Sequence, residues 1–159
     1  MNGRYLTLAG RIRREIKDLE RVVQRSQTIW EQYQAQQDDG FLDGVALNLH
    51  SFYTGVERIL EMIATIIDEY KPSGESWHRE LLLQVATEVP DVRPAVISDS
   101  LLKSLDKYRG FRHVVRNIYT FELEAEQIAP LVTQLPSVYE QSQRELLEFA
   151  NFLEEIGHG

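Results

Sequence analysis

The chain has 159 residues, the length of one ordinary domain with a single hydrophobic core. Hydrophobic residues make up 43% and charged residues 26%, a globular composition that excludes a fully disordered or collagen-like chain. The absence of cysteine excludes disulfides, thiolate zinc sites and cysteine nucleophiles. No apolar run is long enough to cross a bilayer, and Met1 to Gly10 lack a signal-peptide block, so we expect a cytoplasmic protein without membrane contact.

The first half of the chain holds two long segments in which apolar residues recur at steps of three and four, the spacing of an amphipathic helix. The first predicted helix runs from about Leu6 to Gln36 and ends in a polar segment at 36–40. The second runs from about Leu42 to Tyr70 and ends at Lys71-Pro72. Its long apolar stripe makes it the expected central helix of the core.

Three further helices follow in the second half of the chain. Their expected bounds are Trp77 to Glu88, a stretch from just after Ser98 to roughly Tyr119, and about Gln127 to Ile156. Hydroxyl groups suited to capping stand before two of these helices, at Ser76 and Ser98.

Two prolines, Pro130 and Pro136, predict a break in the first part of the last helix, before a regular stretch from Val138 to Leu153. Strand-like alternation, internal repeats and a second domain are not visible in the sequence. The expected fold is therefore all-α, an up-and-down bundle of about five helices in a single domain, residues 1–159.

The net charge of −8 is distributed unevenly along the chain. Residues 1–37 and 97–121 each carry a net +3, whereas residues 38–96 and 122–159 each carry −7. The second basic segment concentrates its cationic and imidazole groups, with Asp106 as the one acid among them, at Lys103, Lys107, Arg109, Arg112, His113 and Arg116. An acidic chain can thus still present a local basic surface to a phosphate.

One face of the predicted fourth helix is apolar except for a single arginine. Its positions, at steps of three and four, are Leu101, Leu105, Tyr108, Arg112, Val115 and Tyr119. Arginine cannot lose its charge to escape the cost of burial, so a partner must compensate it. One interpretation is an ion pair with Glu57, beside the apolar stripe of the second helix. The other is a partly open cleft in which the planar guanidinium group of Arg112 binds a phosphate.

The segment Tyr108-Arg109-Gly110-Phe111-Arg112-His113-Val114-Val115-Arg116-Asn117-Ile118-Tyr119 closely resembles the signature of HEPN-domain proteins, specifically the HepT-like ribonuclease toxins. The family pattern is an arginine, a polar residue, a few spacers, a histidine, any residue and a tyrosine. Arg112, His113 and Tyr119 stand at the arginine, polar and tyrosine positions. The resemblance covers about residues 40–135.

This resemblance implies a metal-independent endoribonuclease without a cofactor. Two copies would dimerise so that their motifs share one cleft, in which the ribose 2′-hydroxyl attacks the adjacent phosphate. Arg112 would orient and neutralise that phosphate, and Lys107, Arg109 and Arg116 would assist electrostatically. Tyr119 would contact the RNA substrate and would also accept AMP from a cognate minimal nucleotidyltransferase antitoxin.

The chain departs from the family pattern at the catalytic histidine, where it has Asn117. Asparagine can hold a phosphate oxygen or a hydroxyl, but it cannot accept a proton near neutral pH. Three interpretations stay open: the nuclease is naturally weakened or inactive, His113 one turn earlier substitutes, or asparagine is an engineered inactivation. Whether the chain is an active enzyme therefore remains open.

The rival function is a HEPN-type bundle that binds RNA, a nucleotide or a partner protein without cleaving anything, and Asn117 favours it. A purely structural adaptor is disfavoured by Arg112 within an apolar stripe. The four histidines lack metal-ligand spacing, so no metal site is predicted. His78, beside Trp77 at the start of the third helix, is interpreted as packing that helix end.

Overall fold

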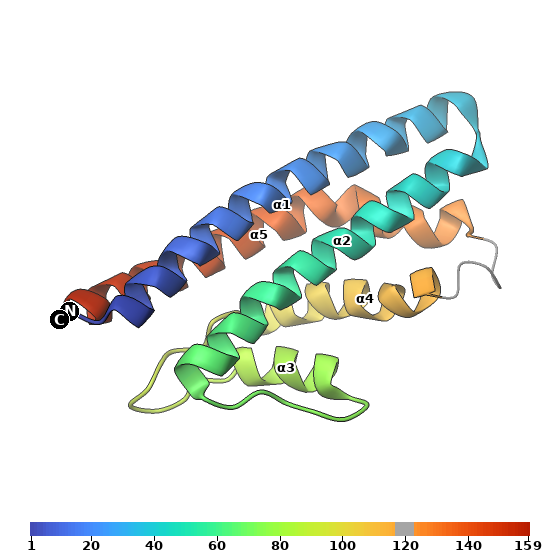
Figure 1. The fold of residues 1–159 in the computed structure, drawn as a ribbon. Coiled ribbons are helices and arrows are strands. Elements are labelled where there is room, and N and C mark those ends of the chain that lie inside the picture. The colour runs from blue at the N-terminus through green and yellow to red at the C-terminus, as the bar shows by residue number, and fades with distance from the viewer. Residues whose placement is uncertain (117–122) are drawn as a thin grey trace.

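The computed structural model of the chain describes residues 1–116 and 123–159, without the side chains of His113 and Arg116. In order, the elements are α1 (Gly3–Gln36), α2 (Asp39–Ile63), the π-helical turn η1 (Ala64–Asp68), α3 (Trp77–Val85), α4 (Asp99–Arg116) and α5 (Ala125–His158) (Figure 1). The described residues form no strand and only one isolated β-bridge, between Val89 and Arg93. The predicted all-α bundle of about five helices is confirmed.

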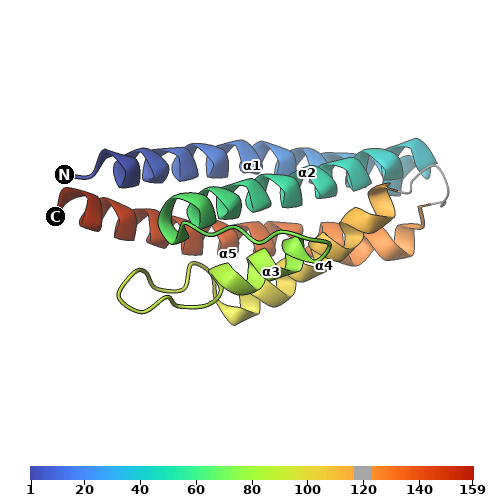
Figure 2. The same ribbon diagram turned by 60° about the horizontal axis from the view of Figure 1, so that its bottom comes forward.

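Three long helices, α1, α2 and α5, lie side by side, and α3 and α4 pack on one side of them (Figures 1 and 2). Helix α2 contacts α1, α3, α4 and α5, which makes it the central helix. Its buried positions are apolar or uncharged with one exception, Glu57, which is 5% exposed. A carboxylate at this depth needs compensating donors, and it marks the place where the functional groups gather.

Helix α1 begins earlier than the sequence pattern predicts. The side chain of Asn2 accepts a hydrogen bond from the Arg4 N–H at 3.0 Å, which caps the helix at Gly3. At the start of α4, the predicted cap is confirmed, because the Ser98 hydroxyl accepts a hydrogen bond from the Leu101 N–H at 3.2 Å. Ser76 does precede α3, but its hydroxyl makes no capping hydrogen bond.

The predicted break in the last helix is wrong, because α5 runs through both prolines. Proline lacks an N–H, so Pro136 leaves the carbonyl of Val132 without its usual partner four residues on. Gln27 of α1 supplies the missing donor, with its Nε2 2.8 Å from that carbonyl. The buried face of α5 continues across the prolines, through Val132, Leu135 and Val138, so packing also favours the unbroken helix.

The α-helical part of the second segment ends at Ile63, short of the predicted Tyr70, and the chain continues as the wider turn η1. Glu69 ends this turn in a left-handed conformation, with φ 54°. A carbonyl at the helix end, that of Ile66, accepts a hydrogen bond from Arg4 of α1 at 2.7 Å. The widened turn places Asp68 against the loop that follows α3.

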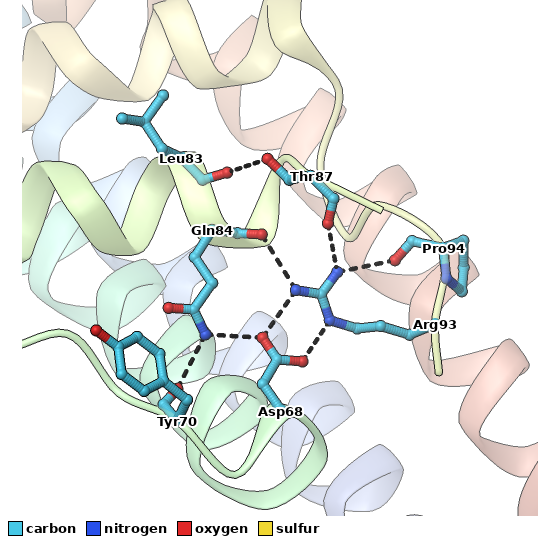
Figure 3. A network of polar contacts seen from close by, with 7 residues as sticks. All are labelled: Asp68, Tyr70, Leu83, Gln84, Thr87, Arg93 and Pro94. Carbon is cyan, nitrogen blue, oxygen red and sulfur yellow. Dashed lines mark hydrogen bonds and ion pairs between the residues drawn. The ribbon is translucent and has the colours of Figure 1, made fainter. Parts of the chain in front are cut away.

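That loop is fastened by Arg93, whose side chain is fully buried (Figure 3). Its guanidinium group donates to both carboxylate oxygens of Asp68, at 2.6 and 2.8 Å. It also donates to the carbonyls of Gln84, Thr87 and Pro94 at 2.9 to 3.1 Å, which uses all five of its N–H groups. Because two of these carbonyls lie at the end of α3, the network ends that helix at Val85, before the predicted Glu88.

Candidate functional site

Three helices bring an acid, an imidazole and a guanidinium group together. Glu57 comes from α2, His78 from the first turn of α3, and Arg112 from the last turns of α4. Glu57 Oε2 lies 2.7 Å from His78 Nδ1, and Glu57 Oε1 lies 3.7 Å from Arg112 Nη1. The same Arg112 nitrogen is 2.7 Å from His78 Nε2. We call these residues the Glu57–His78–Arg112 cluster.

Helical spacing explains why these side chains meet. His78 precedes the buried Leu81 and Leu82 by three and four residues, so it shares the face with which α3 packs on the bundle. Arg112 follows the buried Tyr108 by one turn on the packed face of α4. The hydroxyl of Tyr108 donates to the Leu131 carbonyl at 2.7 Å, which joins this part of α4 to α5.

The hydrogen-bonding capacities of the three groups fix the tautomer of His78. A carboxylate can only accept, so His78 Nδ1 donates its hydrogen to Glu57. The other ring nitrogen, Nε2, then carries a lone pair and accepts from Arg112. The guanidinium nitrogen also approaches Nδ1 at 2.8 Å, but both atoms are donors, so this contact reflects packing against the ring.

The guanidinium group of Arg112 is incompletely satisfied. Its Nε is buried and makes no hydrogen bond with any described residue. The ion pair with Glu57 that the sequence suggested exists, but at 3.7 Å it is long, and the Arg112 side chain stays 20% exposed. A cation with spare donors and access to solvent can bind an anion such as a phosphate.

Aromatic groups border the cluster on two sides. The Trp77 ring packs on His78 with ring centroids 3.6 Å apart, and the ammonium group of Lys71 lies 5.1 Å from the centre of the Trp77 ring. One turn before Glu57, the hydroxyl of Tyr53 is buried without a hydrogen bond to a described residue. Burial, and next the charge of Glu57, raise the pKa of Tyr53 well above its usual value, so this group stays neutral.

The structure places two of the predicted phosphate-binding residues differently. Arg109 lies on the same side of α4 as Arg112 and donates to Asp106 at 2.6 Å. Lys107 is exposed, about 140° around the helix from Arg112, so it points away from the cluster. The side chains of His113 and Arg116, and all of Asn117 and Tyr119, lie outside the described residues. The predicted roles of these four residues stay predictions.

Sequence reasoning did not place His78 in this site. Its interpretation as a packing residue rested on the neighbouring Trp77, and the ring does pack there. The link to Glu57 spans 21 positions and depends on how the 69–76 segment turns back, which periodicity does not determine. The available signal was a charged residue inside the apolar stripe of α2, which required a donor from another helix.

The described residues contain no group of three or more metal-ligating side chains. None of the helices in 1–116 and 123–158 combines the length and the hydropathy that crossing a bilayer requires. With a carboxylate that orients an imidazole and a guanidinium beside it, the cluster is equipped to bind an anion and to move a proton.

A comparison with protein families gives one match. The family model described as HepT-like protein matches residues 44–153, which include Glu57, His78 and Arg112. No curated protein and no solved structure matches the chain.

Proposed function

Because the chain belongs to the family of HepT-like proteins, we propose that it is the ribonuclease-type toxin of a toxin–antitoxin pair. Its substrate is RNA, it acts as a homodimer in the cytoplasm, and its partner is a minimal nucleotidyltransferase antitoxin. The family match supports this proposal, as does the motif from Arg112 to Tyr119. The whole chain acts as one domain, with the matched residues at its centre.

The observation that carries the proposal is the incomplete satisfaction of Arg112. Its Nε has no partner among the described residues, and its one acidic neighbour, Glu57, is 3.7 Å away. A purely structural arginine would have its donors filled, because an unpaired buried polar group is costly. The phosphate of an RNA strand supplies the missing acceptors and would pair with the planar guanidinium group through two hydrogen bonds.

Other residues of the motif assist in this proposal. Arg109 and Arg116 add positive charge near the scissile phosphate, and Asn117 holds the place of the family's histidine by hydrogen bonding alone. Tyr119 contacts the RNA and is also the site where the antitoxin transfers AMP. The added phosphate would offset the positive charge of Arg112 and block the RNA.

RNA binding by the full chain tests the role of Arg112. We expect Arg112→Met to weaken binding of a fluorescein-labelled single-stranded RNA by about 10-fold, measured by fluorescence anisotropy, since it removes one charged contact to phosphate. The dependence of log affinity on log salt concentration should fall by about 0.7 per lost phosphate contact. Arg144→Met, at an exposed position in the acidic last segment, is the matched control. Equal affinities of the Arg112 and Arg144 variants would contradict the proposal.

A second candidate function is RNA, nucleotide or partner binding without cleavage, which Asn117 favours. Restoring the family's residue with Asn117→His separates the two. For a nuclease silenced at this position alone, we expect the variant to cleave RNA and arrest growth when expressed without antitoxin. A variant that binds RNA but does neither would favour the binding function.

A further inference from the structure

His78 is the one imidazole in the Glu57–His78–Arg112 cluster, and it lies outside the family's motif. Its Nδ1 donates to Glu57 Oε2 at 2.7 Å, so its Nε2 carries the lone pair. A carboxylate that holds one ring nitrogen in this way fixes the orientation and tautomer of an imidazole that acts as a base through the other nitrogen. The ring is 20% exposed, which leaves it accessible.

The lone pair of His78 points to the group that would hold the substrate. Arg112 Nη1 lies 2.7 Å from Nε2, so a phosphate bound by Arg112 would stand beside this nitrogen. A phosphate that draws the guanidinium group toward itself also removes the donor from Nε2. Substrate binding would thereby release the base at the moment when it is needed.

From this arrangement we infer that His78 accepts the proton of the ribose 2′-hydroxyl during RNA cleavage, and that Glu57 is the residue that positions its ring. The inference rests on the proposed function. As the bond between the 2′ oxygen and phosphorus forms, the bond from phosphorus to the 5′ oxygen breaks. The 2′ proton moves to His78 Nε2, and the departing 5′ oxygen takes a proton from water. The products are a 2′,3′-cyclic phosphate and a 5′-hydroxyl end, and His78 later returns its proton to solvent.

The inference explains how cleavage can proceed with asparagine in the motif. Asn117 cannot accept a proton, whereas an imidazole held by Glu57 can. The described groups facing His78 are Glu57 from α2, Arg112 from α4 and its neighbour Trp77, with Lys71 beyond the Trp77 ring. A base must be neutral to act, so the rate should fall as the pH is lowered from 8 to 5.

Cleavage of a labelled RNA by the purified full chain tests this role, with the rate and the affinity measured separately. We expect His78→Gln to lower the cleavage rate by about 100-fold or more, the size of a general-base contribution, while RNA affinity changes less than about three-fold. The remaining activity should lose its pH dependence between 5 and 8. Glu57→Gln should show a smaller loss and keep that dependence, because the ring remains. His158→Gln, near the chain end, is the control and should behave as the wild type.

Several results would overturn the inference. If the wild type and His78→Gln cleave at equal rates, or if the wild-type rate is flat from pH 5 to 8, His78 is not the base. If only Asn117→His cleaves, the proposed function stands and the role of His78 falls. If no variant cleaves and Arg112→Met does not weaken RNA binding, the proposed function itself fails. The pH profile of the wild type keeps the test valid even if His78→Gln does not fold.

Discussion

Arg93 and Arg112 are both largely buried, and they differ in how completely their donors are used. Arg93 is fully buried, and all five of its N–H groups donate to Asp68 and to backbone carbonyls (Figure 3). Arg112 contacts an imidazole and a distant carboxylate, and its Nε has no partner among the described residues. The first arginine therefore holds the fold together, and the second retains capacity for a ligand.

The difference follows from what each arginine is packed against. Arg93 lies at the ends of α3 and η1, where helix termini leave carbonyl groups without intrahelical partners. Arg112 lies against the sides of α2 and α3, where the carbonyls are already used within the helices, so only side chains can satisfy it. Burial and charge alone do not distinguish a structural arginine from a binding arginine, whereas the count of satisfied donors does.

Removing Arg93 should have the largest effect on stability. Arg93→Met leaves the carboxylate of Asp68 buried, 7% exposed, without its charged partner, and should lower the free energy of unfolding by about 3–5 kcal/mol. Urea denaturation followed by circular dichroism measures this loss. Arg93→Lys keeps the charge but cannot pair with both oxygens, so it should recover only part of it. A change as small as that of the exposed control Arg144→Met would show that the network does not hold the loop.

The corresponding change at Arg112 should affect stability much less. Arg112→Met removes a long ion pair, and His78 still donates to Glu57, so we expect a loss of about 1 kcal/mol. The same urea experiment provides the comparison with Arg93→Met. A loss equal to that of Arg93→Met would mean that Arg112 is a structural residue, and the contrast between the two arginines would disappear.

The smallest expected effect concerns two buried tyrosines that repeat the contrast. Tyr108 donates to a carbonyl, so Tyr108→Phe should cost about 1 kcal/mol at pH 7. Tyr53→Phe should cost less than about 0.5 kcal/mol, because the Tyr53 hydroxyl makes no hydrogen bond with a described residue.

Both tyrosines also predict how stability depends on alkaline pH. Burial raises the pKa of Tyr53 and of Tyr108 above the usual value of about 10, so the folded state holds these protons more tightly than the unfolded state. Their contribution is complete below about pH 10 and is lost as the pH rises further. Thermal melting between pH 8 and 11 should show a shallower decline in either phenylalanine variant. An unchanged decline would contradict the assigned pKa direction.

Much of the fold follows from local sequence patterns. The apolar periodicity of α1 and α2 predicts their existence, their lengths to within a few residues and the central place of α2. Pro136 misleads, because a side chain of α1, Gln27, replaces the hydrogen bond that proline removes. The ends of α2 and α3 are shifted for the same kind of reason, since Arg93 and Asp68 meet only after the chain has folded back.

The candidate site is predictable in one of its three members and one of its contacts. An arginine within an apolar stripe drew attention to Arg112, and its neighbour Glu57 followed from a charge on the stripe of α2. His78 did not follow, because its place depends on the angle at which a nine-residue helix packs across α2 and α4. Tertiary geometry of that kind has no signature within any window of the sequence.

The widened turn η1 sets the phase of everything that comes after it. A π-helical turn contains one residue more than the α-helix it interrupts, so deleting a single residue from 64–67 would restore regular winding. Asp68 would then rotate by about 100° around the axis, away from Arg93. Because the strap between η1 and α3 starts from this point, the extra residue acts as a spacer that fixes how far His78 can reach toward α4.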